Sequence, residues 1–290
     1  MISIDNEKCN SCEQCLDVCP ARIYMWDTPD EEFKKIIVDN EDLCIYCGHC
    51  IAICPENAIV HEKLPLKLFH SLEPLNITPE SLENLLLSRR SVRTYKMEVF
   101  HQAVIEKLLE VAIHAGTASN TQDIGYVVIQ KKETLLELEA LVTEILWKQL
   151  KRIGNPVLRG LARLYYGNIQ VQRFYRYYLA MKKALGSGDV QNFFFRDAPA
   201  AIILHSPKKD SFGAVNCALA IANMTIMAQS LKVGVCWVGF LIEAANRSHR
   251  INKYLNIPKS QKIHGCLIMG YPKYCYEKSV PRQQPKINWL

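Results

Sequence analysis

The feature that most constrains the fold of this 290-residue chain is a run of four cysteines that occurs twice near its N-terminus. Both runs follow the spacing C-x2-C-x2-C-x3-C, and a proline closes each of them. This tight spacing lets the first three thiolates of a run surround one corner of a small inorganic cube, while the fourth points away from it. The first run is Cys9, Cys12, Cys15, Cys19 and Pro20, and the second is Cys44, Cys47, Cys50, Cys54 and Pro55.

The two runs resemble dicluster bacterial ferredoxins, and the resemblance covers residues 1–62. In that pattern the fourth cysteine of each run binds the cluster of the other run. One [4Fe–4S] cluster is therefore expected on Cys9, Cys12, Cys15 and Cys54. The second is expected on Cys44, Cys47, Cys50 and Cys19.

Two other interpretations of these cysteines are four disulfides in a small secreted module and a set of zinc ligands. Neither predicts two identical runs that each end in proline. Residues 1–5 show no basic region and no long apolar run, so no signal peptide is expected. We therefore expect a cytoplasmic protein, in a reducing compartment where thiols stay free to bind metal.

The charges of the chain are distributed unevenly. Residues 1–62 hold 4 Lys or Arg against 13 Asp or Glu, a net charge of −9, whereas the remainder holds 31 against 16, a net charge of +15. Opposite charges favour docking between an acidic module and a basic body. The basic residues are dispersed and no nucleic-acid motif accompanies them, so no nucleic-acid partner is expected. No membrane partner is expected either, because the longest apolar stretch, residues 214–228, is interrupted by Asn216 and Asn223.

The length suggests about two domains. Residues 1–62 are predicted to form the dicluster domain, with strands at 2–4, 23–26, 35–38 and 58–60 and a polar turn at 30–32. Residues 63–77, with two prolines, are predicted to be a linker, and residues 78–290 the second domain.

Helices and strands alternate in the second domain, which predicts a sheet covered on both faces. Thr78 is a suitable N-cap and Pro79 suits the first position of a helix that reaches residue 88. Gly116 is expected to cap the C-terminus of the next helix. Further periodicity predicts helices at 99–115, 132–152, 156–185 and 211–231, and strands at 126–129, 200–204, 235–238 and 266–269.

The segment Arg89-Arg90-Ser91-Val92-Arg93 concentrates three arginines where a helix gives way to an extended chain. No GxGxxG fingerprint and no P-loop is present. The forked guanidinium group suits phosphate oxygens. A basic helix end also complements the helix dipole, so the segment alone leaves both interpretations open.

Further motifs follow this segment in a fixed order, and the series resembles the nitroreductase family of FMN enzymes over roughly residues 80–290. The whole chain resembles a ferredoxin–nitroreductase fusion. The predicted fold class is α+β, with an N-terminal ferredoxin-like dicluster domain and a nitroreductase-type α/β/α sandwich whose sheet is mixed and largely antiparallel. The motifs are Gly116-Thr117-Ala118-Ser119-Asn120-Thr121-Gln122, Asp197-Ala198-Pro199, Gly234-Val235-Cys236-Trp237-Val238-Gly239-Phe240, Ile257-Pro258, Met269-Gly270-Tyr271-Pro272 and Pro281-Arg282.

The resemblance implies a homodimer with FMN at the subunit interface, and it implies the residues that bind FMN. It assigns contacts with the phosphate and the pyrimidine side of the ring to Arg89, Arg90, Ser91 and Arg93. It assigns hydrogen bonds to the isoalloxazine to Asn120 and Gln122, a backbone that faces N5 to Val238 and Gly239, and a late phosphate contact to Arg282. The chain has Ala115-Gly116-Thr117 where the family often has Ala-Pro-Ser, and Gln122-Asp123-Ile124 where it often has Gln-Pro-Trp. These differences bear on the shape of the loop and on the packing beside the ring.

The flavin would carry the chemistry, so no catalytic side chain is expected. The implied function is an FMN-dependent oxidoreductase that passes electrons from two [4Fe–4S] clusters to the flavin and on to a nitroaromatic or quinone. The donor would be a ferredoxin, another redox enzyme or NAD(P)H. Four alternatives remain open: an electron-transfer subunit that serves a partner protein, a reductive dehalogenase-type flavoenzyme on the same fold, a ring-fragmenting flavoenzyme on that fold, and a redox sensor or scaffold.

The sequence also gives expectations for several other residues. His114 is expected on a helix face, and His49 beside the second cluster without binding it. The aromatic run at 165–195 is expected to pack at the dimer interface, with a lid over the flavin as the alternative. Four further cysteines are expected to be mostly buried hydrophobic residues: Cys217, Cys236, Cys266 and Cys275.

Overall fold

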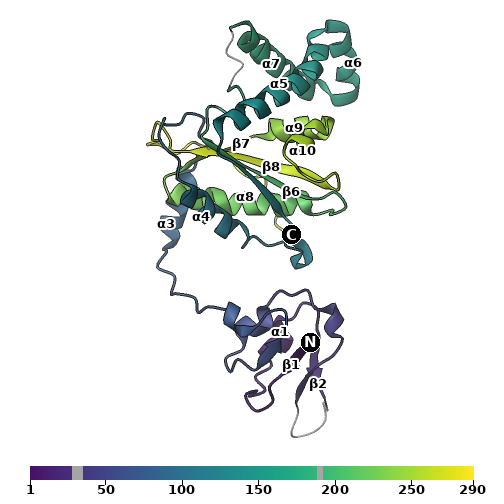
Figure 1. The fold of residues 1–290 in the computed structure, drawn as a ribbon, viewed down its shortest axis with the longest axis vertical. Coiled ribbons are helices and arrows are strands. Elements are labelled where there is room, and N and C mark those ends of the chain that lie inside the picture. The colour runs from purple at the N-terminus through teal and green to yellow at the C-terminus, as the bar shows by residue number, and fades with distance from the viewer. Residues whose placement is uncertain (28–34, 188–191) are drawn as a thin grey trace. The chain divides into compact units, whose positions relative to one another are not determined.

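The computed structural model describes residues 1–27, 35–187 and 192–290, which fall into two units (Figure 1). The first unit comprises Met1–Asn76 together with Ala118–Thr121, and the second comprises Ile77–Thr117 together with Gln122–Leu290. The polar turn expected at 30–32 lies outside the described residues.

Two short antiparallel ribbons frame the first unit. Strand β1 (Ile2–Ile4) pairs with β4 (Ile59–His61), and β2 (Tyr24–Trp26) pairs with β3 (Ile36–Val38). Two five-residue helices, α1 (Gln14–Val18) and α2 (His49–Ile53), each end immediately before the fourth cysteine of a run. Short 3-10 turns lie at η1 (Glu41–Leu43) and η2 (Leu66–Leu68).

The hydrophobic core of this unit is small. Its buried members are Ile2, Cys15, Ile23, Tyr24, Ile36, Ile51 and Ile59. Modules of this size bury little apolar surface, and many of them gain stability from metal ligands or disulfides.

The second unit is built on a four-stranded sheet in the order β5 (Gly125–Ile129), β6 (Ala200–Pro207), β8 (Gln261–Gly270) and β7 (Gly234–Trp237). All three pairings are antiparallel. A parallel bridge between Ser91 and Val235 adds the arginine segment beside β7. The sheet is thus mixed and largely antiparallel.

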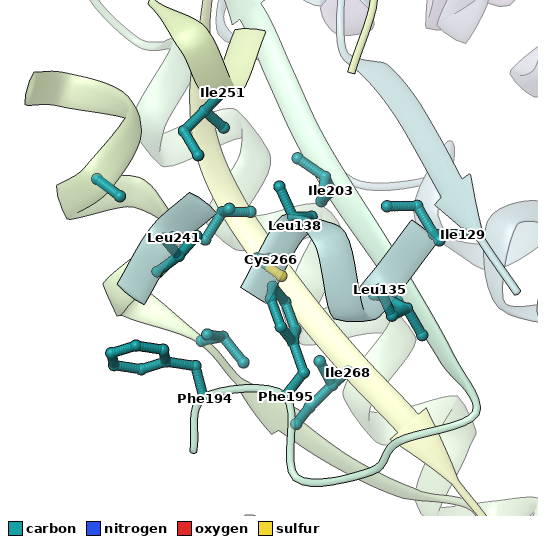
Figure 2. Close-up of a cluster of buried hydrophobic side chains, with 14 of the residues drawn as sticks. Ile129, Leu135, Leu138, Phe194, Phe195, Ile203, Leu241, Ile251, Cys266 and Ile268 are labelled. Carbon is teal, nitrogen blue, oxygen red and sulfur yellow. The ribbon is translucent and has the colours of Figure 1, made fainter. Parts of the chain in front are cut away.

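Alternate residues of the central strands face opposite sides, as a strand's two-residue period requires. Ala200, Ile202 and Leu204 belong to a core with α4 (Gln102–Ala112) and α8 (Gly213–Ser230). Ala201 and Ile203 belong to a second core with α5 (Lys132–Gly154), α9 (Gly239–Arg247) and α10 (Arg250–Tyr254). Figure 2 shows this second core, where Leu138, Leu241, Ile251 and Phe195 gather over Ile203, Cys266 and Ile268.

Three helical expectations are confirmed or corrected by local geometry. Helix α3 (Pro79–Ser88) begins as expected, with the Thr78 hydroxyl accepting a hydrogen bond from the Ser81 N–H at 3.2 Å. The expected cap at Gly116 is wrong, because α4 ends at Ala112 and Ile113 is its C-cap. The single helix expected over 156–185 is also wrong. It is two helices, α6 (Pro156–Tyr166) and α7 (Asn168–Gly186), separated at Gly167, whose φ of 76° no α-helix accepts.

Helices α5, α6 and α7 pack together at one side of the sheet (Figure 1). A buried carboxylate on α5 binds the chain that follows this group of helices. Glu139 on α5 is 2% exposed and accepts hydrogen bonds from the backbone N–H of Phe194 at 2.6 Å and of Phe195 at 3.3 Å. Burial raises the pKa of this carboxyl group to about 7, although the two backbone hydrogen bonds oppose the rise.

Candidate cluster and flavin sites

The eight cysteines of the two runs line two separate cavities. The first cavity is lined by Cys9, Cys12, Cys15 and Cys54. The second is lined by Cys19, Cys44, Cys47 and Cys50. The two cavities are of nearly equal size, so the duplicated runs build two similar sites. Each run therefore lends its fourth cysteine to the cavity of the other.

The arrangement arises from the two short helices. A left-handed residue precedes each helix: Glu13 with φ 64° before α1, and Gly48 with φ 73° before α2. Each helix is one turn long, and its C-cap is the fourth cysteine, in extended conformation. The extended backbone at Cys19 and Cys54 ends the helical turn, so these two side chains leave the run that precedes them.

The state of the thiols fits iron–sulfur clusters. All 12 cysteines are free, which disagrees with a disulfide framework. Burial raises the pKa of Cys15 to about 11, and burial also raises the pKa of Cys50. Positive charge is needed to hold such thiols ionised at neutral pH, and iron supplies it.

Apolar side chains complete both cavities. Ile4, Ile36 and Ile59 lie at the first, and Ile23 and Ile45 at the second. Tyr24 also lines the second cavity, where burial, with the nearby Cys50 adding to its effect, raises the pKa of the phenol far above the usual range. Such surroundings limit the access of water to a bound cluster, and solvent exposure is one determinant of its potential.

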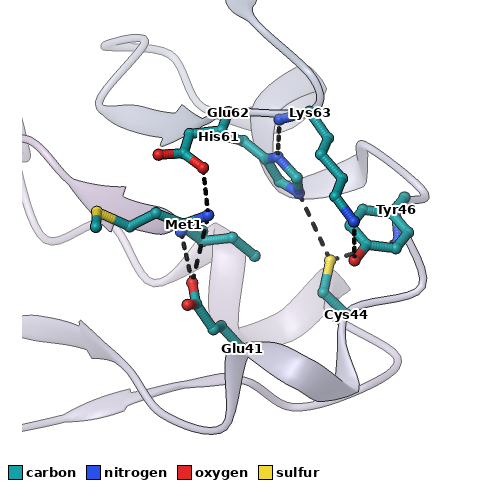
Figure 3. A network of polar contacts seen from close by, with 8 residues as sticks. Met1, Glu41, Cys44, Tyr46, His61, Glu62 and Lys63 are labelled. Carbon is teal, nitrogen blue, oxygen red and sulfur yellow. Dashed lines mark hydrogen bonds and ion pairs between the residues drawn. The ribbon is translucent and has the colours of Figure 1, made fainter.

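One buried residue that lines the second cavity was missed from the sequence. His61, the last residue of β4, lines the second cavity and is 5% exposed. Its Nε2 lies 3.8 Å from the Cys44 Sγ, and its Nδ1 lies 3.1 Å from the Lys63 backbone nitrogen (Figure 3). The duplication gives no signal for it: Trp26 stands seven residues after Cys19 as His61 stands seven after Cys54, but Trp26 lines neither cavity. His49, by contrast, is the exposed first residue of α2, and whether it lies beside a cluster stays a prediction.

The predicted arginine segment follows α3 and runs beside β7. The Val92 N–H donates to the Val235 carbonyl at 2.9 Å. Gly234 allows this close approach, because a Cβ there would lie 2.7 Å from the Val92 side chain. Arg89, Arg90 and Ser91 are half-buried, and Arg93 is exposed.

Arg90 is the most constrained of the three arginines. Its Nη1 donates to the carbonyls of Leu87 and Arg89 at 2.7 and 2.8 Å, and its Nη2 donates to the Lys278 carbonyl at 2.8 Å. Its Nε–H is buried, and no acceptor among the described residues pairs with it. A buried donor without an acceptor is costly, and an anion at this position would satisfy it.

The loop with Asn120 and Gln122 has unusual backbone geometry. Ser119, Asn120 and Gln122 all have positive φ, at 51°, 54° and 48°. Each such residue costs on the order of 1–3 kcal/mol, and such strain gathers at functional sites. Asn120 belongs to the first unit, where its amide donates to the carbonyls of Ile45 and Tyr46 at 3.0 and 2.9 Å. Gln122 belongs to the second unit, and its N–H donates to the Thr117 hydroxyl at 3.1 Å.

Val238 and Gly239 lie where β7 passes into α9. Val238 is buried, and its N–H donates to the Cys266 carbonyl at 2.8 Å. Gly239 is the first residue of α9, so its N–H is among those that have no acceptor within the helix. Of the described residues, a Cβ at Gly239 would have only the Trp237 Nε1 near it, at 4.0 Å, which leaves room for a flat group against the backbone.

The late arginine lies in an exposed segment. Arg282 is exposed in the chain that follows β8. A few residues before Arg282, the same segment contacts Arg90. The Lys278 carbonyl accepts a hydrogen bond from Arg90, and the Tyr276 ring lies 5.9 Å from the Arg90 guanidinium. The structure thus brings this segment to Arg90.

Most rings of the aromatic run contact other rings of the same unit. Tyr178 stacks on Trp147 at 5.7 Å, and Tyr177 meets Phe240 edge to face at 5.0 Å. Tyr165 meets the Tyr166 ring edge to face at 4.8 Å, yet it is 83% exposed. Whether the run is a lid or an interface stays a prediction.

The remaining expectations concern isolated residues. Cys217, Cys236 and Cys266 are buried as expected, and Cys275 is exposed, contrary to the pattern of the other three. His114 lies exposed in the turn after α4, so its expected place on a helix face is wrong. In the part of the chain that the structure describes, no helix has the length and apolar character needed to cross a membrane.

Comparison with known proteins agrees with this geometry. Residues 86–271 match the model of the nitroreductase family, and residues 8–58 match the model of a 4Fe-4S dicluster domain. The N-terminal segment is 44% identical over 59 residues to a ferredoxin of Methanocaldococcus jannaschii, a match that covers 20% of this chain and 74% of the ferredoxin.

Two solved structures share the fold of the second unit. A nitroreductase with bound FMN from Bacteroides fragilis superposes with a TM-score of 0.54 at 21% identity, over 72% of this chain and 98% of that one. An iodotyrosine deiodinase bound to FMN and 3-iodo-L-tyrosine superposes with a TM-score of 0.52 at 15% identity, over 72% and 98%. The expected α+β fold class is confirmed. The chain therefore belongs to the nitroreductase family, and its N-terminal segment is a 4Fe-4S dicluster domain.

Proposed function

We propose that this chain is an FMN-dependent oxidoreductase that passes electrons from two [4Fe–4S] clusters to FMN and on to an electron-poor organic acceptor of the nitroaromatic or quinone class. One observation carries the proposal: two four-cysteine cavities and a nitroreductase-family unit share a single polypeptide. The FMN bound by the similar Bacteroides fragilis enzyme supports the choice of flavin.

The cavities support a crosswise set of cluster ligands. Cys9, Cys12, Cys15 and Cys54 would hold the first cluster, because they line one cavity. Cys44, Cys47, Cys50 and Cys19 would hold the second. The domain limits proposed here are 1–62 for the dicluster domain, 63–77 for the linker and 78–290 for the flavin domain.

The flavin site would be built around Arg90. Its buried Nε–H, which no described residue accepts, is a donor for a phosphate oxygen, with Arg89, Arg93 and Arg282 adding positive charge. Ser91 would contact the ring side of the same segment, and Asn120 and Gln122 would hydrogen-bond the isoalloxazine. Val238 and Gly239 would present their backbone to N5, where Gly239 leaves open space. FMN supplies the electron transfer itself, and these residues bind and orient it.

The electron count supports a two-electron acceptor. Each cluster carries one electron, so both clusters together supply the two electrons that convert a quinone to a hydroquinone or a nitro group to a nitroso group. Two protons from solvent complete either reaction, and the nitro reduction also releases one water. Once a donor has reduced both clusters, the chain holds the two electrons that one turnover needs.

The test is anaerobic purification with iron, sulfide and flavin measured, followed by reduction of the clusters with a stoichiometric chemical reductant. The flavin absorbance should then bleach, and addition of a quinone or nitroaromatic should restore both chromophores. The proposal fails if the flavin stays oxidised while its potential lies above those of the clusters.

A second candidate is reductive dehalogenation, which the likeness in fold to iodotyrosine deiodinase favours. An acceptor screen that includes haloaromatic compounds separates the two, since halide release would identify this activity. The third candidate, an electron-transfer subunit, would show reducible clusters and flavin but no turnover of any small acceptor.

We infer a homodimer, with FMN at its interface, in the cytoplasm. Helix α6 supplies a surface for self-association: Val157, Leu161, Leu164 and Tyr165 are 59–86% exposed on its side opposite Arg159 and Arg163. Two copies of this uncharged face can pack about a twofold axis without burying charge. Light scattering should give twice the 33.2 kDa chain mass. The double variant Leu161→Glu/Leu164→Glu should be monomeric, whereas Gln172→Glu on exposed α7 should not.

A further inference from the structure

The side chain of His61 is held in one orientation beside the second cavity. It is almost fully buried, and the Tyr46 ring meets it edge to face at 5.7 Å. The Lys63 ammonium in turn donates to the Tyr46 hydroxyl at 2.8 Å (Figure 3). These contacts restrict the imidazole to the plane in which its Nε2 faces Cys44.

The hydrogen bonds identify which ring nitrogen carries the proton. The Lys63 backbone N–H can only donate, so the His61 Nδ1 that lies 3.1 Å from it must accept and carries no hydrogen. The hydrogen of the neutral ring is therefore on Nε2, which lies 3.8 Å from the Cys44 Sγ. This geometry is that of an N–H···S hydrogen bond from imidazole to a cluster thiolate.

A donor at a ligand sulfur has a defined effect on a cluster. It withdraws electron density from the thiolate and stabilises the extra negative charge that reduction adds, so the reduction potential rises. The Tyr46 backbone N–H already donates to the same sulfur at 3.4 Å. His61 adds a side-chain donor, which substitution can remove without altering the backbone.

We propose that His61 is a positioning residue that donates its Nε2 hydrogen to Cys44 and so raises the potential of the cluster held by Cys19, Cys44, Cys47 and Cys50. The inference rests on the proposed cluster ligands. A higher potential at the second cluster draws electrons away from the first. Electrons are therefore expected to pass from the first cluster to the second.

The test is an anaerobic redox titration of the full chain, followed by electron paramagnetic resonance so that the two clusters are resolved. His61→Leu should lower the potential of one cluster and leave the other unchanged. The expected change is about tenfold in the electron distribution between the clusters, which is about 59 mV for one electron. His61→Gln, whose amide Nε2 can also donate, should restore most of the shift.

The matched control is His70→Leu, the same substitution at an exposed histidine of the first unit that lines neither cavity. Its potentials should equal those of the unaltered chain. Equal potentials in the His61→Leu variant and the unaltered chain, or equal shifts of both clusters, would overturn the proposal.

A second measurement covers the case in which His61→Leu does not retain its cluster. Pulsed resonance on the unaltered chain labelled with 15N-histidine should detect a nitrogen coupled to the second cluster, and His61→Gln should abolish that signal. Absence of the coupling in a fully loaded protein overturns the role of His61. Absence of iron and sulfide from the anaerobic protein would instead refute the proposed function.

Discussion

At the residue scale, Cys54 connects the two halves of the dicluster domain. It follows α2 in the second run, yet it lines the cavity of Cys9, Cys12 and Cys15. Cys54→Ser should therefore deplete the cluster of the first run and keep that of the second. The resonance signal that survives should match the one that survives in Cys12→Ser.

The comparison variant for this prediction is Cys47→Ser, which removes a ligand of the other cavity. If the Cys54→Ser variant retained the same signal as the Cys47→Ser variant, then each run would hold its own cluster and the crosswise assignment would be wrong.

Glu139 predicts a pH dependence of stability. Its pKa is about 7 in the folded chain, above its value of 4.5 when exposed, because burial disfavours the charged form. Between pH 4.5 and 7 the unfolded chain has lost this proton while the folded chain keeps it, so stability falls as pH rises. The total loss is about 3 kcal/mol, complete slightly above pH 7.

Glu139→Gln should remove this component. Denaturant unfolding of both chains between pH 4.5 and 8 should show the stability of the variant rising relative to that of the unaltered chain as pH increases. The amide of the variant has only one oxygen to accept the two backbone N–H groups. This changes the stability of the variant by an amount that does not vary with pH. A difference that stays constant with pH would show that the carboxyl group is ionised throughout.

The residues that sequence identifies well are those whose chemistry repeats. Eight cysteines in two equal runs predict two clusters without reference to the fold. His61 was missed because a single histidine on a strand carries no periodic signal, and its meaning depends on where Cys44 lies. Arg90 shows the same limit: its charge was predicted, but the burial of its Nε follows from carbonyls as distant as Lys278.

At the element scale, Gly167 separates α6 from α7. Its φ of 76° and ψ of 159° lie in a region that only glycine occupies readily. No atom of the described residues lies within 4 Å of a Cβ built there, so Gly167→Ala would cost backbone strain alone. The expected loss is about 1–3 kcal/mol of unfolding free energy.

Gly160 is the matched control, since a Cβ there also meets no described atom within 4 Å, but it lies inside α6. Gly160→Ala should stabilise by about 0.5–1 kcal/mol, because alanine loses less conformational freedom in a helix. Thermal unfolding of the two variants should therefore shift in opposite directions. Shifts of the same sign would mean that α6 and α7 do not turn at Gly167.

The length of an element did not decide how well the sequence predicted it. The three-residue strands β1 to β4 were predicted within one residue of their bounds, whereas the prediction of 266–269 covers less than half of the ten-residue β8. The apolar stretch of α8 and the strands β5 and β6 were found within a few residues of their bounds. Helices α9 and α10 were missed, since nine and five residues give too few turns to establish a helical period. The break at Gly167 was missed because glycine also occurs inside helices. Only the packing of α6 and α7 against α5 shows that Gly167 lies between two helices.

At the scale of the whole molecule, the two parts of the chain carry opposite net charges. Residues 1–62 carry a net charge of −9 and the remainder +15. Opposite charges on tethered partners hold them together more strongly at low ionic strength, because the screening length falls from about 30 Å at 0.01 M salt to about 3 Å at 1 M. Electron transfer from the clusters to the flavin should therefore slow as salt is added.

Stopped-flow measurement of flavin bleaching after rapid reduction of the clusters tests this expectation. The rate should not depend on protein concentration, because donor and acceptor share one chain, and it should fall between 0.01 M and 1 M salt. The exposed acidic residues Glu7 and Asp42 provide a charge variant, Glu7→Gln/Asp42→Asn, whose rate should depend less on salt. A rate proportional to protein concentration would mean that electrons travel between separate molecules, and the fusion of the two domains would then serve another purpose.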